Sequence, residues 1–200
     1  MTLPEGITEL APGKIASVVT YLQMFVRPAP RDITAPTGLS VQRHKAPSVE
    51  WYRELYRLVG EGYLWFSRLE MADEDLAAHL ARDEVEVCSV VRDGRDLGLL
   101  ELEWFDNGDC ELSFFGLAPD LVGGGVGRWL MEHALERAFA RPIERFFVHT
   151  CTLDSSQALG FYERSGFVAY GRAIEIVDDP RNRGLIAADK APQIHHFPMA

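Results

Sequence analysis

The chain has 200 residues, of which 47% are hydrophobic and 25% are charged, and its formal net charge is −10. These values are typical of a soluble globular chain, and the length suits one domain. No segment reaches the roughly 18 consecutive apolar residues of a membrane helix, and the N-terminus lacks the basic start and apolar run of a signal peptide. We therefore expect a cytoplasmic protein that binds neither a membrane nor nucleic acid, whose phosphates the negative charge would repel.

Residues 1–38 are predicted to be an N-terminal extension and linker packed on the main domain. Ile15 to Phe25 are rich in Val, Thr, Tyr and Leu, which favours an extra strand or a packed extension. Prolines and a glycine interrupt residues 27–38, which indicates a linker.

The next segment predicts a short strand, Leu39 to Arg43, followed by two helices. Ser48 is a candidate N-cap for the first helix, because the apolar residues after it recur at helical spacing. The second helix is expected to begin at the acidic residues 73–75, which the helix dipole favours in a first turn, and to end near Arg82.

Three strands should then form an antiparallel meander: Val85 to Val91, Leu97 to Trp104 and Cys110 to Phe115. They are separated by Asp93-Gly94 and Asn107-Gly108, the dipeptides best suited to tight hairpin turns.

The last third of the chain predicts a helix, a strand, a short helix and final strands. The apolar residues of 125–141 fall on one helical face, Arg145 to Thr150 is β-rich, Ser155 or Ser156 can cap a short helix through Tyr162, and Gly166 closes that helix. Phe167 to Val177 reads as the last strands, and residues 179–200 as an irregular tail packed on the surface. The fold class is mixed α/β, with a central, mostly antiparallel twisted sheet flanked by helices.

A glycine-rich turn, Gly123 to Gly127, joins a strand to a helix. Unpaired backbone N–H groups and the positive end of a helix dipole meet there, which favours phosphate binding. A P-loop is excluded because Arg128 follows Gly127, and a dinucleotide fingerprint is excluded because Arg128 and Leu130 stand where glycine is required. By itself the turn also fits a flexible loop that binds nothing.

Pro119, the glycine turn and the later stretch from Ser155 to Phe167 together resemble the two sequence motifs of the GNAT superfamily of N-acetyltransferases. The resemblance covers roughly residues 39–178 and implies the GNAT acyl-CoA N-acyltransferase fold with acetyl-CoA as cosubstrate. Val122 stands where the family usually has Gln or Arg, and Ser155 where it commonly has Asn. The cofactor-binding residues that the resemblance implies are Phe115, Leu117, Val122, Gly123, Gly124, Gly125, Val126, Gly127, Arg128 and Ser155.

Acetylation of an amine requires one base and one acid near the sulfur of the cofactor. Tyr162 matches the family's second-motif tyrosine, which is often the acid, although a core tyrosine is the alternative. Glu111 matches a strand glutamate that some members use as the base. A two-residue turn at Asn107-Gly108 would pair Trp104 with Glu111 and raise the carboxyl pKa by desolvation. A one-residue slip would instead favour Glu101 or Glu103, and a water chain is a further alternative.

His149 and Cys151 lie two apart on a β-rich segment and are interpreted as packing residues, so a covalent cysteine mechanism is disfavoured. The cysteines, Cys88, Cys110 and Cys151, form no C-x-x-C pair, and neither a disulfide framework nor a metal site is expected. Most aromatic residues between Trp51 and Phe66 are expected in the core, with one or two lining an amine pocket.

The sequence thus favours an enzyme that transfers acetyl directly from acetyl-CoA to a primary amine of a small molecule or peptide. The alternatives are a non-catalytic acyl-CoA-binding or regulatory module with the same fold, and a structural protein whose glycine turn binds no ligand. The oligomeric state is not fixed by the sequence, and a homodimer is one option.

Overall fold

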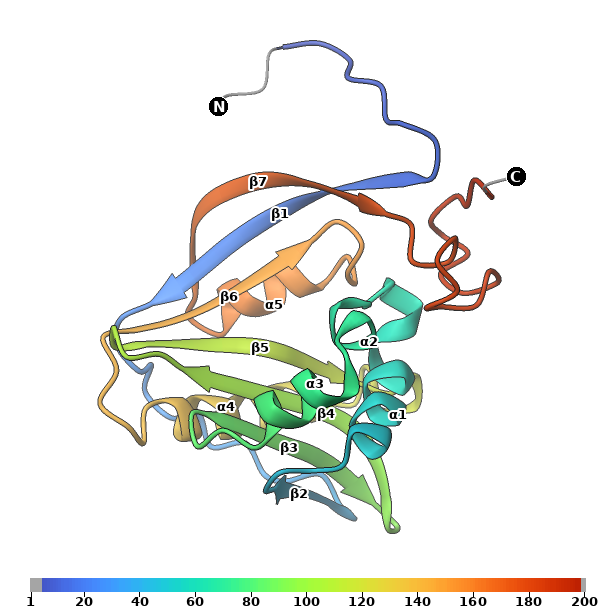
Figure 1. Ribbon diagram of the computed structural model, residues 1–200. Helices are drawn as coiled ribbons and strands as arrows, with labels where there is room; N and C mark the ends of the chain where they lie inside the picture. Colours follow the sequence, from blue (N-terminus) through green and yellow to red (C-terminus); the bar gives the residue numbers. More distant parts are fainter. Residues whose placement is uncertain (1–4, 199–200) are drawn as a thin grey trace.

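A single seven-stranded sheet organises the computed structural model, which describes residues 5–198 (Figure 1). The strand order is β2-β3-β4-β5-β6-β1-β7, and within residues 5–198 only β5 and β6 pair in parallel. The strands are β1 (Lys14–Met24), β2 (Leu39–His44), β3 (Val85–Arg92), β4 (Arg95–Trp104), β5 (Asp109–Leu117), β6 (Arg145–Cys151) and β7 (Val168–Asp178). The predicted mixed α/β fold with a mostly antiparallel sheet is confirmed.

Helices cover both faces of this sheet. In Figure 1, α1, α2 and α3 lie in front of it and α4 lies behind it. The helices are α1 (Val49–Gly60), η1 (Glu61–Tyr63), α2 (Ser67–Glu70), α3 (Asp73–Leu80), η2 (Pro119–Leu121), α4 (Val126–Ala138) and α5 (Ala158–Arg164). No helix among residues 5–198 has the length and apolar character needed to cross a membrane.

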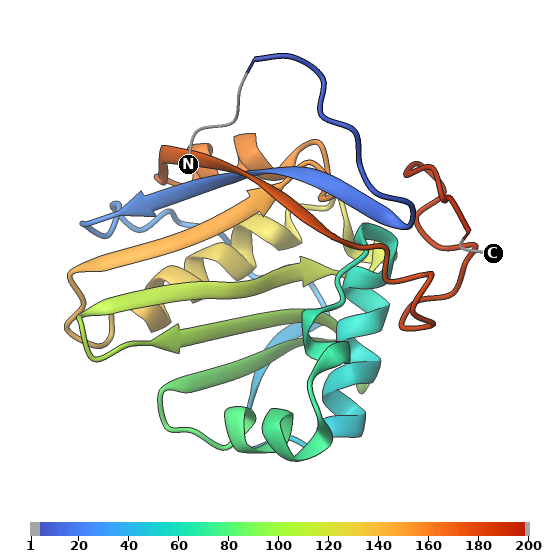
Figure 2. The same ribbon diagram turned by 45° about the horizontal axis from the view of Figure 1, so that its top comes forward.

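The N-terminal strand lies inside the sheet. β1 runs antiparallel to both of its neighbours, with Leu22 opposite Val148 of β6 and Val18 opposite Ile174 of β7. Figure 2 shows this arrangement, with β1 in blue between β6 in orange and β7 in red. Of the two interpretations of residues 15–25, the strand is therefore the observed one.

The predicted helix starts are correct at α1 and wrong at α5. The hydroxyl of Ser48 accepts the backbone N–H of Trp51 at 3.3 Å, as an N-cap does. Neither Ser155 nor Ser156 caps α5, because Ser155 accepts the N–H of Gln157 at 3.3 Å in a turn that precedes the helix. The helix then ends before Gly166, whose φ of 103° is the left-handed conformation expected of a closing glycine.

The hairpin between β4 and β5 has a three-residue loop, which corrects the predicted pairing. Phe105 donates its N–H to Asp109 at 2.9 Å, and Gly108, with a φ of 82°, donates to Phe105 at 3.1 Å. This is a turn followed by a left-handed bulge residue. Trp104 consequently pairs with Cys110, and Glu111 pairs with Glu103. The predicted contact of Trp104 with Glu111 is wrong, because the slip places the two side chains on opposite faces.

Two hydrophobic clusters fill the two faces of the sheet. One combines the central strands with α4, α5 and Trp104; the other combines them with α1, α3 and the C-terminal tail, which contributes Ile186 and Ala191. The tail is held by buried Arg181, which pairs with Asp179 and donates to the carbonyl of Ile194 at 2.9 Å. Residues 179–198 are thus irregular, as expected, but partly buried.

Candidate active site

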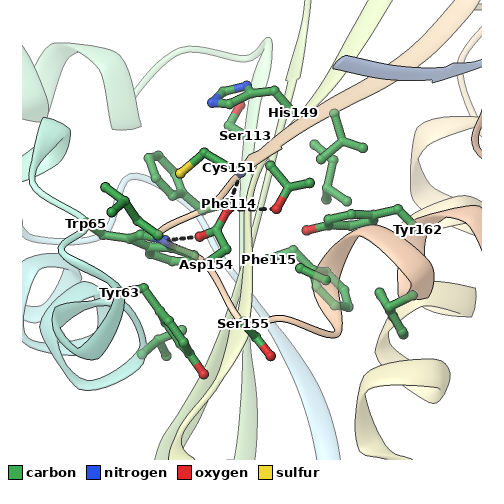
Figure 3. Close-up of a pocket in the computed structure, with 18 of the residues that line it drawn as sticks. Tyr63, Trp65, Ser113, Phe114, Phe115, His149, Cys151, Asp154, Ser155 and Tyr162 are labelled. Atoms are coloured by element: carbon green, nitrogen blue, oxygen red, sulfur yellow. Dashed lines mark hydrogen bonds between the residues drawn. The ribbon is translucent and has the colours of Figure 1, made fainter. Parts of the chain in front are cut away.

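The sheet opens between its two parallel strands. β5 and β6 pair only from Asp109 opposite Arg145 to Glu111 opposite Phe147, and beyond that point they separate. A cavity of about 1430 Å³ is lined by both separated strands, by the glycine turn, by α5 and by the segment from α1 to α2. Figure 3 shows side chains of β5, of β6 and the loop after it, of α5 and of the segment from α1 to α2 around this cavity.

The open edge of β5 presents backbone groups to this cavity. Ala118 donates its N–H to Leu97 of β4 at 2.8 Å. Because hydrogen-bonded positions alternate along an antiparallel pair, Phe114 and Gly116 also direct their backbone groups to β4. Phe115 therefore directs its N–H and C=O toward the side that β6 has left, where a ligand can bond to them.

The glycine turn lies at one end of the cavity. Gly123 and Gly125 have φ of 93° and 82°, conformations that glycine adopts without strain. Gly125 is the N-cap residue of α4 and supplies no side chain, so the first N–H groups of the helix lack a side-chain cap. A Cβ on Gly123 would meet no atom within 4 Å, which shows that the turn faces open space. The turn can thus accept an anion on its backbone.

Arg128 of α4 lies beside the turn, with Nη2 3.5 Å from the position that a Cβ on Gly125 would take, and its positive charge adds to that of the helix N-terminus. Arg164 of α5 and Arg31 of the segment between β1 and β2 also line the cavity. The charge of Arg31 is balanced by an ion pair of 2.5 Å between its Nε and Glu132. This end of the cavity favours phosphate groups.

The predicted cofactor residues converge on this cavity. All of them line it except Gly124 and Val126, which belong to the turn but not to the lining. Val122, the departure from the family pattern, has 59% of its surface exposed and so places an apolar side chain at the cavity rim. Ser155 is exposed in the loop between β6 and α5.

Tyr162 is 7% exposed, yet its hydroxyl points into the cavity (Figure 3). The ring packs between Phe115, Phe161 and Phe167, with centroid distances of 6.5, 5.6 and 5.9 Å. Burial, and secondly the charge of Asp154, raises the pKa of Tyr162 well above its ordinary value of 10. The hydroxyl therefore keeps its proton at any physiological pH and is available as a donor.

Glu111 lies at the vertex where β5 and β6 begin to separate. Its side chain is 20% exposed and lines the cavity, and its Oε1 is 3.4 Å from Nδ1 of His149 on β6. The environment that was expected to tune this carboxyl, the indole of Trp104, is on the other face of the sheet. The neighbour that the carboxyl has instead is His149, half of whose side chain is exposed. The interpretation of His149 as a packing residue is therefore wrong.

The two rival glutamates are bound to cations. Glu101 is fully buried and accepts hydrogen bonds from the Tyr52 hydroxyl and from Arg68, the latter at 2.6 Å. Glu103 lines the cavity, but Arg82 pairs with it at 2.5 Å. Neither carboxylate is as open as Glu111.

Asp154 was not anticipated from the sequence. Its carboxylate accepts from Thr150 Oγ1 at 2.7 Å, from the Cys151 N–H at 2.9 Å and from Trp65 Nε1 at 3.1 Å. It thereby joins the loop after β6 to the segment between α1 and α2, across the cavity (Figure 3). Because three donors occupy it, this carboxylate serves better as an anchor than as a base. A sequence signal exists only in retrospect, in an acidic residue before two serines at the end of a strand.

The aromatic stretch between Trp51 and Phe66 contributes more to the cavity than the one or two residues predicted. Tyr56, Tyr63, Trp65 and Phe66 line the cavity, whereas Tyr52 is fully buried and does not. Cys151 also lines it, but burial and secondly the charge of Asp154 raise the pKa of its thiol. A protonated thiol is a poor nucleophile, which agrees with the low weight given to a covalent mechanism.

Comparison of the sequence with protein families supplies the decisive observation: a profile of the acetyltransferase (GNAT) family matches residues 48–167. The chain belongs to the GNAT family. The match contains the separated strands, the glycine turn and α5. A comparison of this GNAT sequence with curated proteins gave no match.

Solved structures share the GNAT fold at low sequence identity. A GCN5-related N-acetyltransferase from Sphaerobacter thermophilus superposes with a TM-score of 0.58 and 13% identity, covering 84% of this chain and 52% of that one. An aminoglycoside acetyltransferase from an uncultured soil metagenomic sample, in complex with sisomicin, superposes with a TM-score of 0.57 and 17% identity. The superposition covers 69% of this chain and 93% of that one. A functionally unknown conserved protein from Staphylococcus epidermidis superposes with a TM-score of 0.54 and 16% identity, covering 84% of this chain and 63% of that one. The chain thus spans only about half to two thirds of two of these structures.

Proposed function

We propose that this GNAT protein transfers an acetyl group directly from acetyl-CoA to a primary amine. The observation that carries the proposal is one continuous cavity lined by the glycine turn and by the side chains of Glu111, His149 and Tyr162. In the net reaction, a protonated amine and acetyl-CoA give an acetamide, the CoA thiol and one proton.

The chain's own groups suit this cosubstrate, whose thioester supplies the activated acetyl group. The backbone N–H groups of the glycine turn would hold the pyrophosphate, with Arg128 nearby. The free N–H of Phe115 and the side chain of Leu117 would line the pantetheine path. Val122 would add no polar contact, so we expect weaker cofactor binding than with Gln or Arg but no loss of it.

Tyr162 is proposed as the acid that protonates the departing thiolate, because its hydroxyl is protonated and points into the cavity. The base is proposed to lie at the vertex, where Glu111 meets His149. The acid and base positions are thus on two sides of the open strand edge, one on α5 and one on β5 and β6.

The acceptor is proposed to be a cationic amine on a small molecule or peptide. Away from the glycine turn, the cavity is lined by the carboxylates of Glu111, Asp154 and Glu175 and by the aromatic side chains between α1 and α2. Arg68 also lines this part, but its charge is neutralised by Glu101. Carboxylates attract a cationic amine, and aromatic faces stabilise one.

The three free cysteines fit a reducing compartment, and we propose the cytoplasm.

Two measurements test the proposal. The first is the melting temperature with and without CoA, because a ligand of the native state must raise it. The second is release of CoA thiol from acetyl-CoA across a panel of polyamines, aminoglycosides, amino acids and peptides. Amine-dependent thiol release with a matching acetylated product is the expected result. A raised melting temperature without release for any amine would refute transfer and leave an acyl-CoA-binding module; no change in melting temperature would refute the cofactor site itself.

A further inference from the structure

The contact between Glu111 and His149 follows from the register of the parallel strands. Glu111 is opposite Phe147, so their side chains share a face, and His149, two residues further along β6, shares it as well. Pairing stops at this position, which leaves His149 on the separated part of β6, with its side chain half exposed and lining the cavity.

We propose that Nε2 of His149 is the atom that accepts the proton of the amine, and that Glu111 is a positioning residue that orients the imidazole. This proposal rests on the proposed acetyl transfer. It assigns to Glu111 an indirect role in place of the direct one that its strand position suggests.

The orientation of the ring determines which nitrogen is free. Nδ1 is the atom 3.4 Å from the Glu111 carboxylate, so this carboxylate favours the neutral tautomer that carries its proton on Nδ1. The lone pair of Nε2 is then the only basic position left on the ring. A carboxylate that fixes the tautomer in this way also stabilises the imidazolium after the proton has arrived.

The surrounding charges keep this imidazole suitable for a base. Glu111 of β5, by hydrogen bonding, raises the pKa of His149 above its ordinary value of 6.5; burial opposes the shift, and the charges of Asp154 and of Glu175 on β7 support it. Tyr21 of β1 lies beside the ring, with a centroid distance of 6.4 Å. A base whose pKa lies near the operating pH is the efficient choice.

The proton step balances without another reactant. One N–H bond of the protonated amine breaks, its electron pair stays on the amine nitrogen, and an N–H bond forms at Nε2. The imidazolium then releases this proton to solvent, which accounts for the single proton in the net reaction. The nitrogen loses its second proton after it has attacked the thioester, and that proton replaces the one that Tyr162 gives to the departing thiolate.

The test compares His149→Gln and Glu111→Gln with wild type, and uses His133→Gln on α4 as a matched control outside the cavity. Two quantities are measured: the pH dependence of kcat/KM for an accepted amine, and the titration of the His149 Cε1–H resonance by NMR in the protein without acetyl-CoA. His149→Gln should lose the acidic limb of the pH profile, the fall in kcat/KM as the imidazole becomes protonated, and about 10²–10⁴-fold in kcat. Glu111→Gln should keep a limb and move both it and the NMR titration to lower pH, because the imidazolium loses its carboxylate.

The opposite pattern overturns the proposal: a limb retained by His149→Gln and lost by Glu111→Gln makes Glu111 the base. An unshifted NMR titration in Glu111→Gln overturns the positioning role. If wild-type protein acetylates no amine, the proposed transfer fails and the base assignment fails with it, whereas the NMR shift still reports the pairing independently.

Discussion

Replacing Tyr162 by phenylalanine deletes one hydroxyl from the proposed acid and leaves its ring in place. The ring keeps its contacts with Phe115, Phe161 and Phe167. The largest expected stability loss is that of one hydrogen bond, about 1 kcal/mol. Since small domains have roughly 5–15 kcal/mol of stability, the variant should remain folded.

The expected effect on turnover is much larger. A positioned general acid contributes about 10²–10⁴-fold to kcat, which corresponds to about 2.7–5.4 kcal/mol of transition-state stabilisation. The expected loss of stability and the expected loss of turnover differ widely enough that Tyr162→Phe alone can distinguish a general acid from a core tyrosine. Because burial raises the pKa of Tyr162 well above 10, deprotonation of this residue should add no alkaline limb to the profile below that pH.

The assay measures kcat, the affinity for acetyl-CoA and the melting temperature of wild type, Tyr162→Phe and Tyr170→Phe. Tyr170 is a matched control, because it is half exposed on β7 and does not line the cavity. A loss of kcat confined to Tyr162→Phe, with unchanged affinity for acetyl-CoA, is expected. Near-wild-type kcat in this variant would refute the reasoning and leave Tyr162 a packing residue.

Three further predictions concern the glycine turn and two buried charges. Gly124→Val should weaken CoA binding at least about tenfold by calorimetry. The chain should stay folded, because the added Cβ would meet only Val126, at 4.0 Å. Binding equal to wild type would argue against the turn as the phosphate site. Arg181→Met should lower the free energy of unfolding in urea by about 3–5 kcal/mol, since it leaves the buried carboxylate of Asp179 unpaired; a loss below about 1 kcal/mol would contradict this. Burial raises the pKa of Glu86, but its ion pairs with arginines outweigh burial and lower it below 4.5, so its stabilisation is present above that pH and lost as the pH falls. Chemical denaturation across this range should show that the free energy of unfolding depends less steeply on pH in Glu86→Gln than in wild type. An unchanged slope would exclude Glu86 as a source of the pH dependence.

Local sequence signals predicted the features that depend on local conformation. Asp93-Gly94 forms a tight two-residue hairpin, with φ of 51° and 73° and Arg92 paired with Arg95. The glycine turn and α4 also lie where the sequence places them. Each of these depends on residues only a few positions apart.

The second hairpin shows where such signals stop. In Asn107-Gly108, glycine can close a two-residue turn or occupy the left-handed position after a three-residue one, and both choices suit the same residues. The choice moves every later residue of β5 to the other face. A second shift, between Leu102 opposite Leu112 and Glu101 opposite Phe114, leaves Ser113 as an extra residue, and no short-range pattern marks it.

The functional partners that the sequence missed are distant in the chain. Glu111 meets His149, and Trp65 meets Asp154, only because β5, β6 and the segment after α1 come together around one cavity. Neither pair has a spacing that a motif could encode. A histidine on a strand is interpreted as packing unless the strand is known to border an open edge.

The interior place of β1 has a consequence for how the chain reaches its native state. This strand is synthesised before β6 and β7, yet it pairs with both, and Val18 bonds to the Thr152 hydroxyl across 134 residues of sequence. Closing a flexible loop of that length costs about 4 kcal/mol of entropy, which only late contacts repay. During translation, the apolar side chains of β1 lack their native partners until β6 and β7 have been synthesised. We therefore expect slow, late closure of this half of the sheet and a need for protection from aggregation until then.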